Sequence, residues 1–75
     1  MKDKLLRAIK GRGFSVSDLV FKMNREYKVK IATRTFYKKL NDFDRFRLPE
    51  IQAITLILGL DVKEAEDIFF PEVVA

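Results

Sequence analysis

The chain has 75 residues, the length of one small domain. Apolar residues make up 48% of it and charged residues 35%, so we expect a folded globule rather than a disordered tail. The absence of cysteine and histidine excludes disulfides, thiolate metal sites and histidine acid–base chemistry. No apolar run reaches the roughly 18–20 residues of a membrane span, and residues 1–13 lack the apolar core of a secretory signal. We therefore expect a cytoplasmic protein that is not an enzyme and uses no metal or cofactor.

The charges are divided unevenly along the chain, whose net charge is +4. Residues 1–47 hold 14 basic and 5 acidic side chains, whereas residues 48–75 hold one basic side chain, Lys63, and 6 acidic ones. A basic region favours a polyanionic partner, nucleic acid first, and the acidic region is expected to face away from it. The alternative interpretation is a solvated charged surface that binds no ligand.

A first helix is expected over residues 2–10, where Leu5 and Ile9 belong to an apolar stripe. Glycines at positions 11 and 13 are expected to end it, because glycine accepts the left-handed conformation of a helix C-cap.

A second helix is expected from Ser15 to about Asn24. Ser15 and Asp18 have the spacing of a capping box, in which each side chain bonds the backbone amide of the other residue. The expected buried face consists of Leu19, Val20 and Met23.

Residues 25–31 alternate between apolar and basic side chains, but the segment is short and is expected to be a lengthened loop.

A third helix is expected over residues 33–40, with Thr33 as the better of two candidate N-caps, Ala32 being the other. Phe36 and Leu40 are expected to face inward. The outward side chains are expected to be Arg34, Tyr37, Lys38 and Lys39.

The loop over residues 42–47 carries two phenylalanines, of which Phe46 is expected in the core while Phe43 is left open. Asp42 and Asp44 could imitate a catalytic pair, but no cleft, metal motif or histidine accompanies them.

A fourth helix is expected to have Pro49 in its first turn and to end at Gly59, and a fifth to begin with the Asp61/Glu64 capping pair and to end at Pro71. The inward residues are expected to be Ile51, Ile54, Ile57 and Leu58, followed by Val62, Ala65, Ile68 and Phe69. The whole chain therefore reads as one all-α domain of five helices.

At this point the chain resembles the Cro/repressor (XRE-type) family of phage and bacterial transcriptional regulators. The resemblance covers about residues 4–70. Gly13–Val20 matches the family's second helix and Ala32–Asn41 its third. Leu48–Phe70 matches the fourth and fifth helices together. The resemblance implies a lambda-repressor-like domain with a helix-turn-helix at about residues 15–41.

The resemblance also implies where double-stranded DNA is bound. The third helix is then the recognition helix in the major groove, with Thr33, Arg34 and Lys38 at base-reading positions. Arg34 is the best candidate, because a guanidinium can bond both O6 and N7 of guanine. The remaining implied DNA-binding residues are Thr35, Tyr37, Lys39, Asn41, Ser15 and Ser17. Independently of the resemblance, the basic residues of the lengthened turn, Arg25, Lys28 and Lys30, are expected to follow the phosphate backbone.

Three features depart from the family pattern. Residues 25–30 lengthen the turn by about six residues, which is expected to affect the placement of the recognition helix. Val16 stands early in the second helix, where the family often has a phosphate-binding glutamine. Arg47 stands before the fourth helix, where the family usually has a capping threonine or serine.

Two exposed apolar features are expected in addition. Phe21 falls on an outward face and could be covered by Tyr27, Val29 or Ile31. A patch that would form a homodimer interface is expected from Leu56, Phe70, Val73 and Val74. The apolar tail, residues 69–75, could instead be an extended arm on its own domain or a frayed end.

These observations predict a small, phage- or prophage-type DNA-binding transcriptional regulator that acts as a homodimer and is controlled by its concentration or by a partner protein. The alternative is a protein–protein interaction module, either an antirepressor or a degenerate helix-turn-helix that acts through its apolar C-terminal patch.

Overall fold

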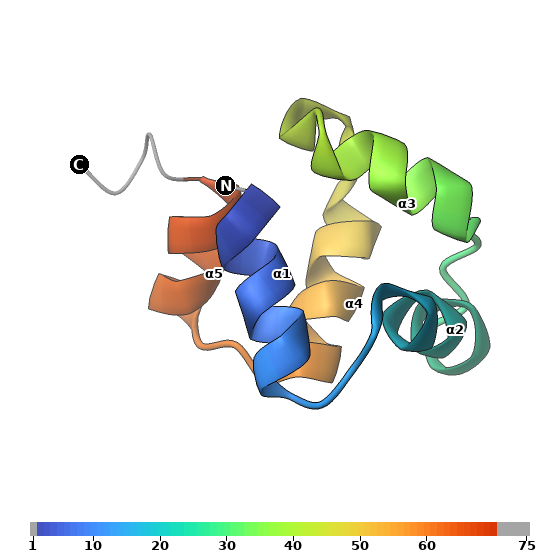
Figure 1. Ribbon diagram of the computed structural model, residues 1–75, viewed down its shortest axis with the longest axis horizontal. Coiled ribbons are helices and arrows are strands. Elements are labelled where there is room, and N and C mark those ends of the chain that lie inside the picture. The colour runs from blue at the N-terminus through green and yellow to red at the C-terminus, as the bar shows by residue number, and fades with distance from the viewer. Residues whose placement is uncertain (1, 71–75) are drawn as a thin grey trace.

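The computed structural model describes residues 2–70, which contain five α-helices, one 3-10 turn and no strand (Figure 1). The helices are α1 (Lys2–Gly11), α2 (Val16–Glu26), α3 (Thr33–Leu40), α4 (Leu48–Leu58) and α5 (Val62–Phe69), with the 3-10 turn η1 (Phe43–Arg45) between α3 and α4. This confirms the expected all-α class. None of these helices is long and apolar enough to cross a membrane.

Two helices begin with the capping boxes that the sequence predicts. The Ser15 hydroxyl accepts from the Asp18 amide at 3.1 Å, and the Asp18 carboxylate accepts from the Ser15 amide at 3.0 Å. Asp61 and Glu64 make the same exchange at the start of α5. Each box satisfies two amides that would otherwise lack a partner at a helix start.

Two helices end in Schellman motifs that depend on a glycine in the left-handed conformation. After α1, Gly13 has φ 79°, and the Phe14 amide donates to the Ile9 carbonyl at 3.1 Å. After α4, Gly59 has φ 64°, and the Leu60 amide donates to the Thr55 carbonyl at 3.0 Å. The predicted roles of Gly13 and Gly59 are confirmed, and both motifs occupy carbonyls that the last helical turn leaves free. Gly11, also expected to end α1 in the left-handed conformation, is instead its last helical residue and has no positive φ.

The start of α3 differs from the prediction. Its N-cap is Ala32 and no side chain caps it, while Thr33 is already the first helical residue. Thr33 was therefore wrongly expected to cap this helix. At the start of α4, Arg47 is the N-cap and its amide donates to the Glu50 carboxylate at 2.9 Å.

One hydrophobic core joins all five helices. Its fully buried side chains come from α1, α2, α3 and α4, and the largest are Phe36, Leu5, Ile9, Leu19, Met23, Ile54 and Leu58. Near α5 the core is aromatic: the rings of Phe43, Phe46 and Phe69 lie 5.2–5.8 Å apart, and Phe36 lies 5.6 Å from Phe46 in an edge-to-face contact. Phe46 is buried as predicted, and Phe43 is half-buried.

Several burial predictions need correction. Val62, expected to face inward, is 75% exposed because it is the first residue of α5. Ile51 and Ile57, also expected inward, are only half-buried, whereas Ile68 and Phe69 of α5 are buried as predicted. Val16, absent from the expected buried face of α2, is buried there. Pro71 and the rest of the tail lie outside the described residues.

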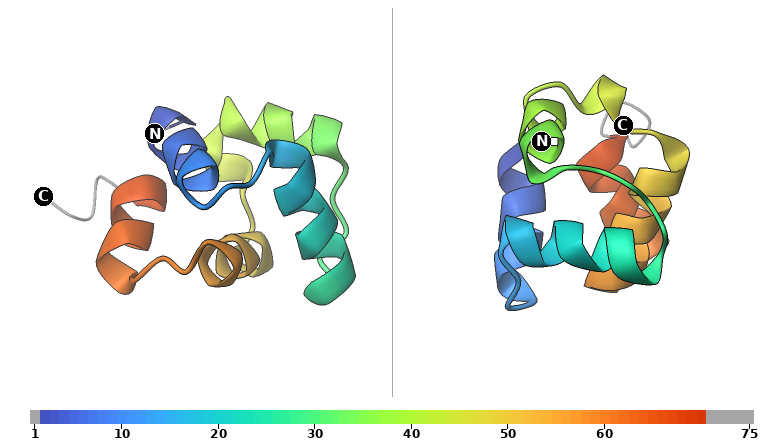
Figure 2. Two further views of the ribbon diagram at one scale, coloured as in Figure 1. Left: turned by 60° about the horizontal axis from the view of Figure 1, so that its bottom comes forward. Right: turned by 90° about the vertical axis from the view of Figure 1, so that its right-hand side faces the viewer.

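The helices are arranged so that α2 and α3 form one side of the molecule and α5 the other (Figure 1). Helix α2 lies steeply across α3. Helix α4 packs on α2 and lies below α3 in the view of Figure 1. In the right-hand view of Figure 2, α1 and α4 occupy opposite edges and α3 lies above α1. This arrangement leaves the outer face of α3 free of other helices.

Candidate nucleic-acid interface

The exposed face of α3 carries basic and polar side chains and no acid. Phe36 and Leu40 are buried against the core, and this orientation turns Arg34 and Lys38, one helical turn apart, toward solvent. Thr35, Tyr37 and Asn41 are exposed on the same helix or at its end, and Thr33 is half-buried. The predicted outward orientation of Arg34, Tyr37 and Lys38 is confirmed.

Lys39 does not point outward, and this prediction is wrong. Its ammonium bonds both oxygens of Glu50 on α4 at 2.6 Å, and the two side chains are only 13% and 8% exposed. The pair joins α3 to the start of α4, where Glu50 also accepts the Arg47 amide. Lys39 is therefore committed to holding α3 in place and is not available as a phosphate contact.

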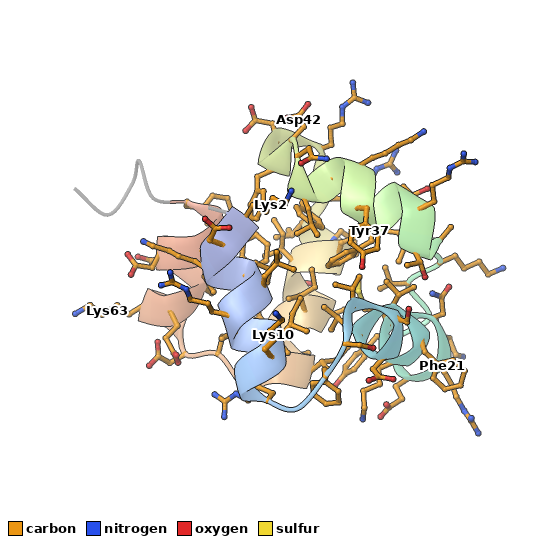
Figure 3. The ribbon with its side chains drawn as sticks, in the orientation of Figure 1. Lys2, Lys10, Phe21, Tyr37, Asp42 and Lys63 are labelled. Atoms are coloured by element: carbon orange, nitrogen blue, oxygen red, sulfur yellow. The ribbon has the colours of Figure 1, made fainter. Side chains whose placement is uncertain are left out.

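Tyr37 of α3 and the start of α2 line the same groove. This groove of about 430 Å³ is lined by Tyr37 together with Leu6, Ile9, Lys10, Phe14, Ser15 and Val16. Figure 3 shows the Tyr37 ring directed from α3 toward the beginning of α2, with Lys10 of α1 on the same side of the molecule. The groove therefore brings the middle of α3 and the N-terminus of α2 onto one surface.

The N-terminus of α2 presents two exposed serines, Ser15 and Ser17, beside the carboxylate of Asp18. Hydrogen bonds from the backbone and side chain of Ser15 lower the pKa of Asp18 below its usual value of 3.8, so this carboxylate is ionised at neutral pH. Its charge offsets part of the attraction that a helix N-terminus exerts on an anion. Val16 is buried, so an apolar residue suits this position.

The linker between α2 and α3 spans residues 27–32 and is held by a side chain that the sequence analysis missed. Asn24 donates to the carbonyls of Val20 and Ile31 at 2.8 Å and accepts from the Ile31 amide at 3.2 Å. The Val29 amide also donates to the Met23 carbonyl at 2.9 Å. The long turn is thus tied to the last turns of α2, and no local pattern around Asn24 signals these bonds.

Two basic residues predicted to bind DNA, Lys28 and Lys30, are exposed on this linker. Lys28 adopts φ 55°, a left-handed conformation that costs a non-glycine residue about 1–2 kcal/mol. This conformation lets the chain leave α2, and Ile31 then returns to the core.

Arg25, expected in the turn, belongs to the last turn of α2. Its guanidinium carbon lies 5.6 Å from the ring centre of Phe21, which remains 59% exposed. The prediction that the linker covers Phe21 is therefore wrong, because Ile31 is buried elsewhere in the core. Figure 3 shows Phe21 away from Tyr37 and the exposed face of α3.

At the α3–α4 connection, Asn41 accepts a hydrogen bond from the Lys2 ammonium at 3.2 Å, which joins α1 to the end of α3. Asp42 accepts from Arg45 at 3.1 Å within the 3-10 turn. The ammonium of Lys2 therefore lies at one end of the exposed face of α3.

The expected dimer patch is described only in part, because Val73 and Val74 lie outside residues 2–70. Leu56 and Phe70 are both exposed. Leu56 lies close to the turn between α4 and α5, whereas Phe70 follows the far end of α5 (Figure 1). The two residues therefore mark separate places on the surface.

Comparison with protein-family models, with curated proteins and with solved structures gave no match to this chain.

Proposed function

We propose that this protein is a sequence-specific DNA-binding transcriptional regulator. In this proposal the five helices form a lambda-repressor-like domain, and α2, the linker and α3 form its helix-turn-helix. Helix α3 enters the major groove, while the start of α2 and the linker lie along the phosphate backbone.

The observation that carries the proposal is the exposed face of α3. It displays Arg34 and Lys38 with no acidic neighbour on the helix, while Phe36 and Leu40 anchor the opposite face. A helix about 10–12 Å wide fits a major groove that is about 12 Å wide. The Lys39–Glu50 pair adds rigidity, because it fixes α3 against α4 through two short bonds.

Each exposed group suits a particular contact. Arg34 can donate two hydrogen bonds to guanine O6 and N7, and Lys38 can donate to a base edge or a phosphate one turn later. Tyr37, Ser15, Ser17 and Asn41 can donate to phosphate oxygens and set the register of the helix on the duplex. Lys28 and Lys30 on the linker contribute charge that attracts the backbone without selecting a sequence.

The test is fluorescence anisotropy of labelled duplex DNA, titrated with the purified protein over a series of salt concentrations. A mixed-sequence duplex measures the electrostatic part, and selection from a random pool measures sequence preference. We expect affinity to fall steeply with salt, since each cation that neutralises a phosphate releases counterions. Arg34→Ala is expected to weaken binding to a selected site by about 1–3 kcal/mol.

Lys63→Ala is the matched control. It removes the same charge as Lys38→Ala, but Lys63 lies on α5, on the other side of the molecule from α3 (Figure 3). The proposal predicts that Lys38→Ala lowers the salt slope by about one and that Lys63→Ala leaves it unchanged. Absence of binding at low salt, or equal effects of the two variants, would refute it.

A protein–protein interaction module is the second candidate, and exposed Leu56 and Phe70 favour it. Under this alternative, Leu56→Glu abolishes partner binding while Arg34→Ala has little effect. The anisotropy experiment separates the two functions, because the alternative requires no affinity for DNA.

A further inference from the structure

The groove between α1, the start of α2 and Tyr37 of α3 has the size and lining of a small-molecule site. Its volume of about 430 Å³ lies within the roughly 300–1,000 Å³ that is usual for such sites. Four of its lining residues are apolar: Ile9 and Val16 are buried, and Leu6 and Phe14 are half-buried. The proposed function uses polar groups of this groove and leaves its apolar lining without a role.

The sides of the groove on α1 and α2 are fixed by their own contacts. The Phe14 amide donates to the Ile9 carbonyl at 3.1 Å in the motif that ends α1. The Lys22 ammonium lies 5.4 Å from the centre of the Phe14 ring, and Val16 follows the Ser15 cap. The groove therefore exists without a ligand, and such preorganisation lowers the free-energy cost of binding one.

The polar lining of the groove offers hydrogen-bond donors. It consists of Lys10, Ser15 and Tyr37. Within residues 2–70 the Lys10 ammonium forms no ion pair, and the Tyr37 hydroxyl forms no hydrogen bond. The Ser15 hydroxyl accepts from the Asp18 amide at 3.1 Å, which leaves its own proton free to be donated.

The charge of the groove therefore favours an anion. Asp18 is not among the lining residues, and its carboxylate is bonded to the Ser15 amide. Lys10 is thus the one charged residue of the described lining. Figure 3 shows Lys10 and Tyr37 on the same side of the molecule, from α1 and α3 respectively.

We propose that this groove binds a small aromatic carboxylate. The ring of the ligand contacts the apolar lining, where Phe14 and Tyr37 offer aromatic surfaces. The carboxylate accepts from the Lys10 ammonium and from the hydroxyls of Tyr37 and Ser15. An uncharged hydrocarbon would leave these donors unused, and an inorganic anion would leave the apolar lining uncovered.

Occupancy of the groove is expected to oppose DNA binding, and this step rests on the proposed function. Tyr37 and Ser15 are two of the donors that the proposed function assigns to phosphate oxygens. A bound carboxylate engages both and adds a negative charge next to the exposed face of α3, where it repels the duplex. The ligand then acts as an effector that releases the protein from DNA.

NMR spectra of the isotope-labelled protein, titrated without DNA, test the binding site. The probe is 1-naphthaleneacetate, and 1-naphthaleneacetamide is its match in shape without the charge. A ligand of about 14 non-hydrogen atoms in an open groove is expected to have a dissociation constant of about 0.1–1 mM. We expect saturable shifts of the amide signals of residues 9–16 and of Tyr37, and at least about fivefold weaker binding of the uncharged match. Absence of saturation by about 5 mM, shifts confined to other residues, or equal affinities of the two compounds would overturn the proposal.

Variants of exposed residues test the donors without disturbing the core. Lys10→Gln is expected to weaken binding of the carboxylate at least about fivefold, and Tyr37→Phe, which removes only the hydroxyl, about threefold. Lys63→Gln is the control, because it removes the same charge from α5, on the other side of the molecule from α3 (Figure 3). The same spectra verify that each variant folds. Equal effects of Lys10→Gln and Lys63→Gln would overturn the proposal.

The anisotropy assay tests the effect on DNA. The carboxylate at about ten times its dissociation constant is expected to weaken DNA binding about tenfold, as for two ligands that exclude each other. The uncharged match at the same concentration is expected to have a smaller effect. Unchanged DNA affinity at saturation would overturn the effector role. A protein that binds the carboxylate but no DNA at low salt would instead refute the proposed function and leave the ligand site intact.

Discussion

Helices α3 and α4 share one core and are joined by the Lys39–Glu50 pair, but they are stabilised in different ways. Helix α4 has 11 residues, a proline in its first turn, a Glu50 carboxylate on its first free amide and a glycine cap. Helix α3 has 8 residues, no side-chain N-cap and no left-handed residue at its end. Isolated helices of this length are unstable in water, so α3 depends on its tertiary contacts.

The two helices also differ in what they expose. Helix α3 buries two apolar side chains and displays cations, whereas α4 displays leucines and buries its only charge. Helix α3, which carries the candidate binding surface, is therefore the less stabilised of the two by its own sequence. Its position comes from Glu50 at one end and from the linker held by Asn24 at the other.

The largest effect is expected from Glu50→Ala, which breaks the connection between the two helices. The substitution leaves the Lys39 ammonium buried without a partner and is expected to lower the free energy of unfolding by about 3–5 kcal/mol. Urea denaturation measures this loss. The double variant Lys39→Met/Glu50→Leu is expected to lose less than Glu50→Ala, because no unpaired charge remains. A loss below about 1 kcal/mol for Glu50→Ala would mean that the pair behaves as an exposed one.

Asn24→Ala tests the other support of α3. It removes two hydrogen bonds between α2 and Ile31 of the linker and one within α2, to the Val20 carbonyl, and is expected to cost about 1–3 kcal/mol. Hydrogen exchange at the Ile31 amide should accelerate, since Asn24 is its acceptor. Asn41→Ala is the control: its amide makes one 3.4 Å bond to the Tyr37 carbonyl and accepts one from exposed Lys2, so its effect is expected within about 0.5 kcal/mol. Equal losses would show that the linker is held by other contacts.

Gly59→Ala tests how far α4 depends on its own cap. Alanine at φ 64° is strained, and a loss of about 1–2 kcal/mol is expected in thermal or urea unfolding. Gly11→Ala is matched to it, since Gly11 is the last residue of α1, has no positive φ, and a methyl group there meets no atom within 4 Å. Gly11→Ala is expected to leave stability unchanged or raise it by up to about 1 kcal/mol. If both variants behave alike, backbone conformation is not what ends α4.

Ala32→Ser has the smallest expected effect. It would give α3 a side-chain N-cap, so that the start of α3 is stabilised as the start of α4 already is. Ala32 already has the extended conformation of an N-cap, so a serine hydroxyl there can accept from the first free amides of α3. A gain of about 0.5–1 kcal/mol is expected, seen as a rise of a few degrees in the unfolding temperature. Ala32→Val offers no oxygen and should give no such gain.

Interactions within three to five residues were predictable, and the structure confirms them. The Ser15–Asp18 and Asp61–Glu64 boxes and the glycine caps at Gly13 and Gly59 depend on spacing alone. The bounds 33–40 of α3 also match, because Phe36 and Leu40 mark its inward face. Two local predictions failed, because Ala32 rather than Thr33 is the N-cap of α3 and α2 continues to Glu26. The other failures involved longer separations: Lys39 pairs with a residue 11 positions away, and the linker tied down by Asn24 leaves Phe21 uncovered.

The sequence by itself determined an all-α domain and a basic surface on α3, because helix caps, apolar spacing and charge are local properties. Only the tertiary structure decided which cations remain free and which helix face lacks a partner. Lys38 and Lys39 are adjacent and chemically identical, yet one is exposed and the other neutralises Glu50. That difference arises from the packing of α3 on α4, since a buried charge is stable only where a second element supplies its counter-charge.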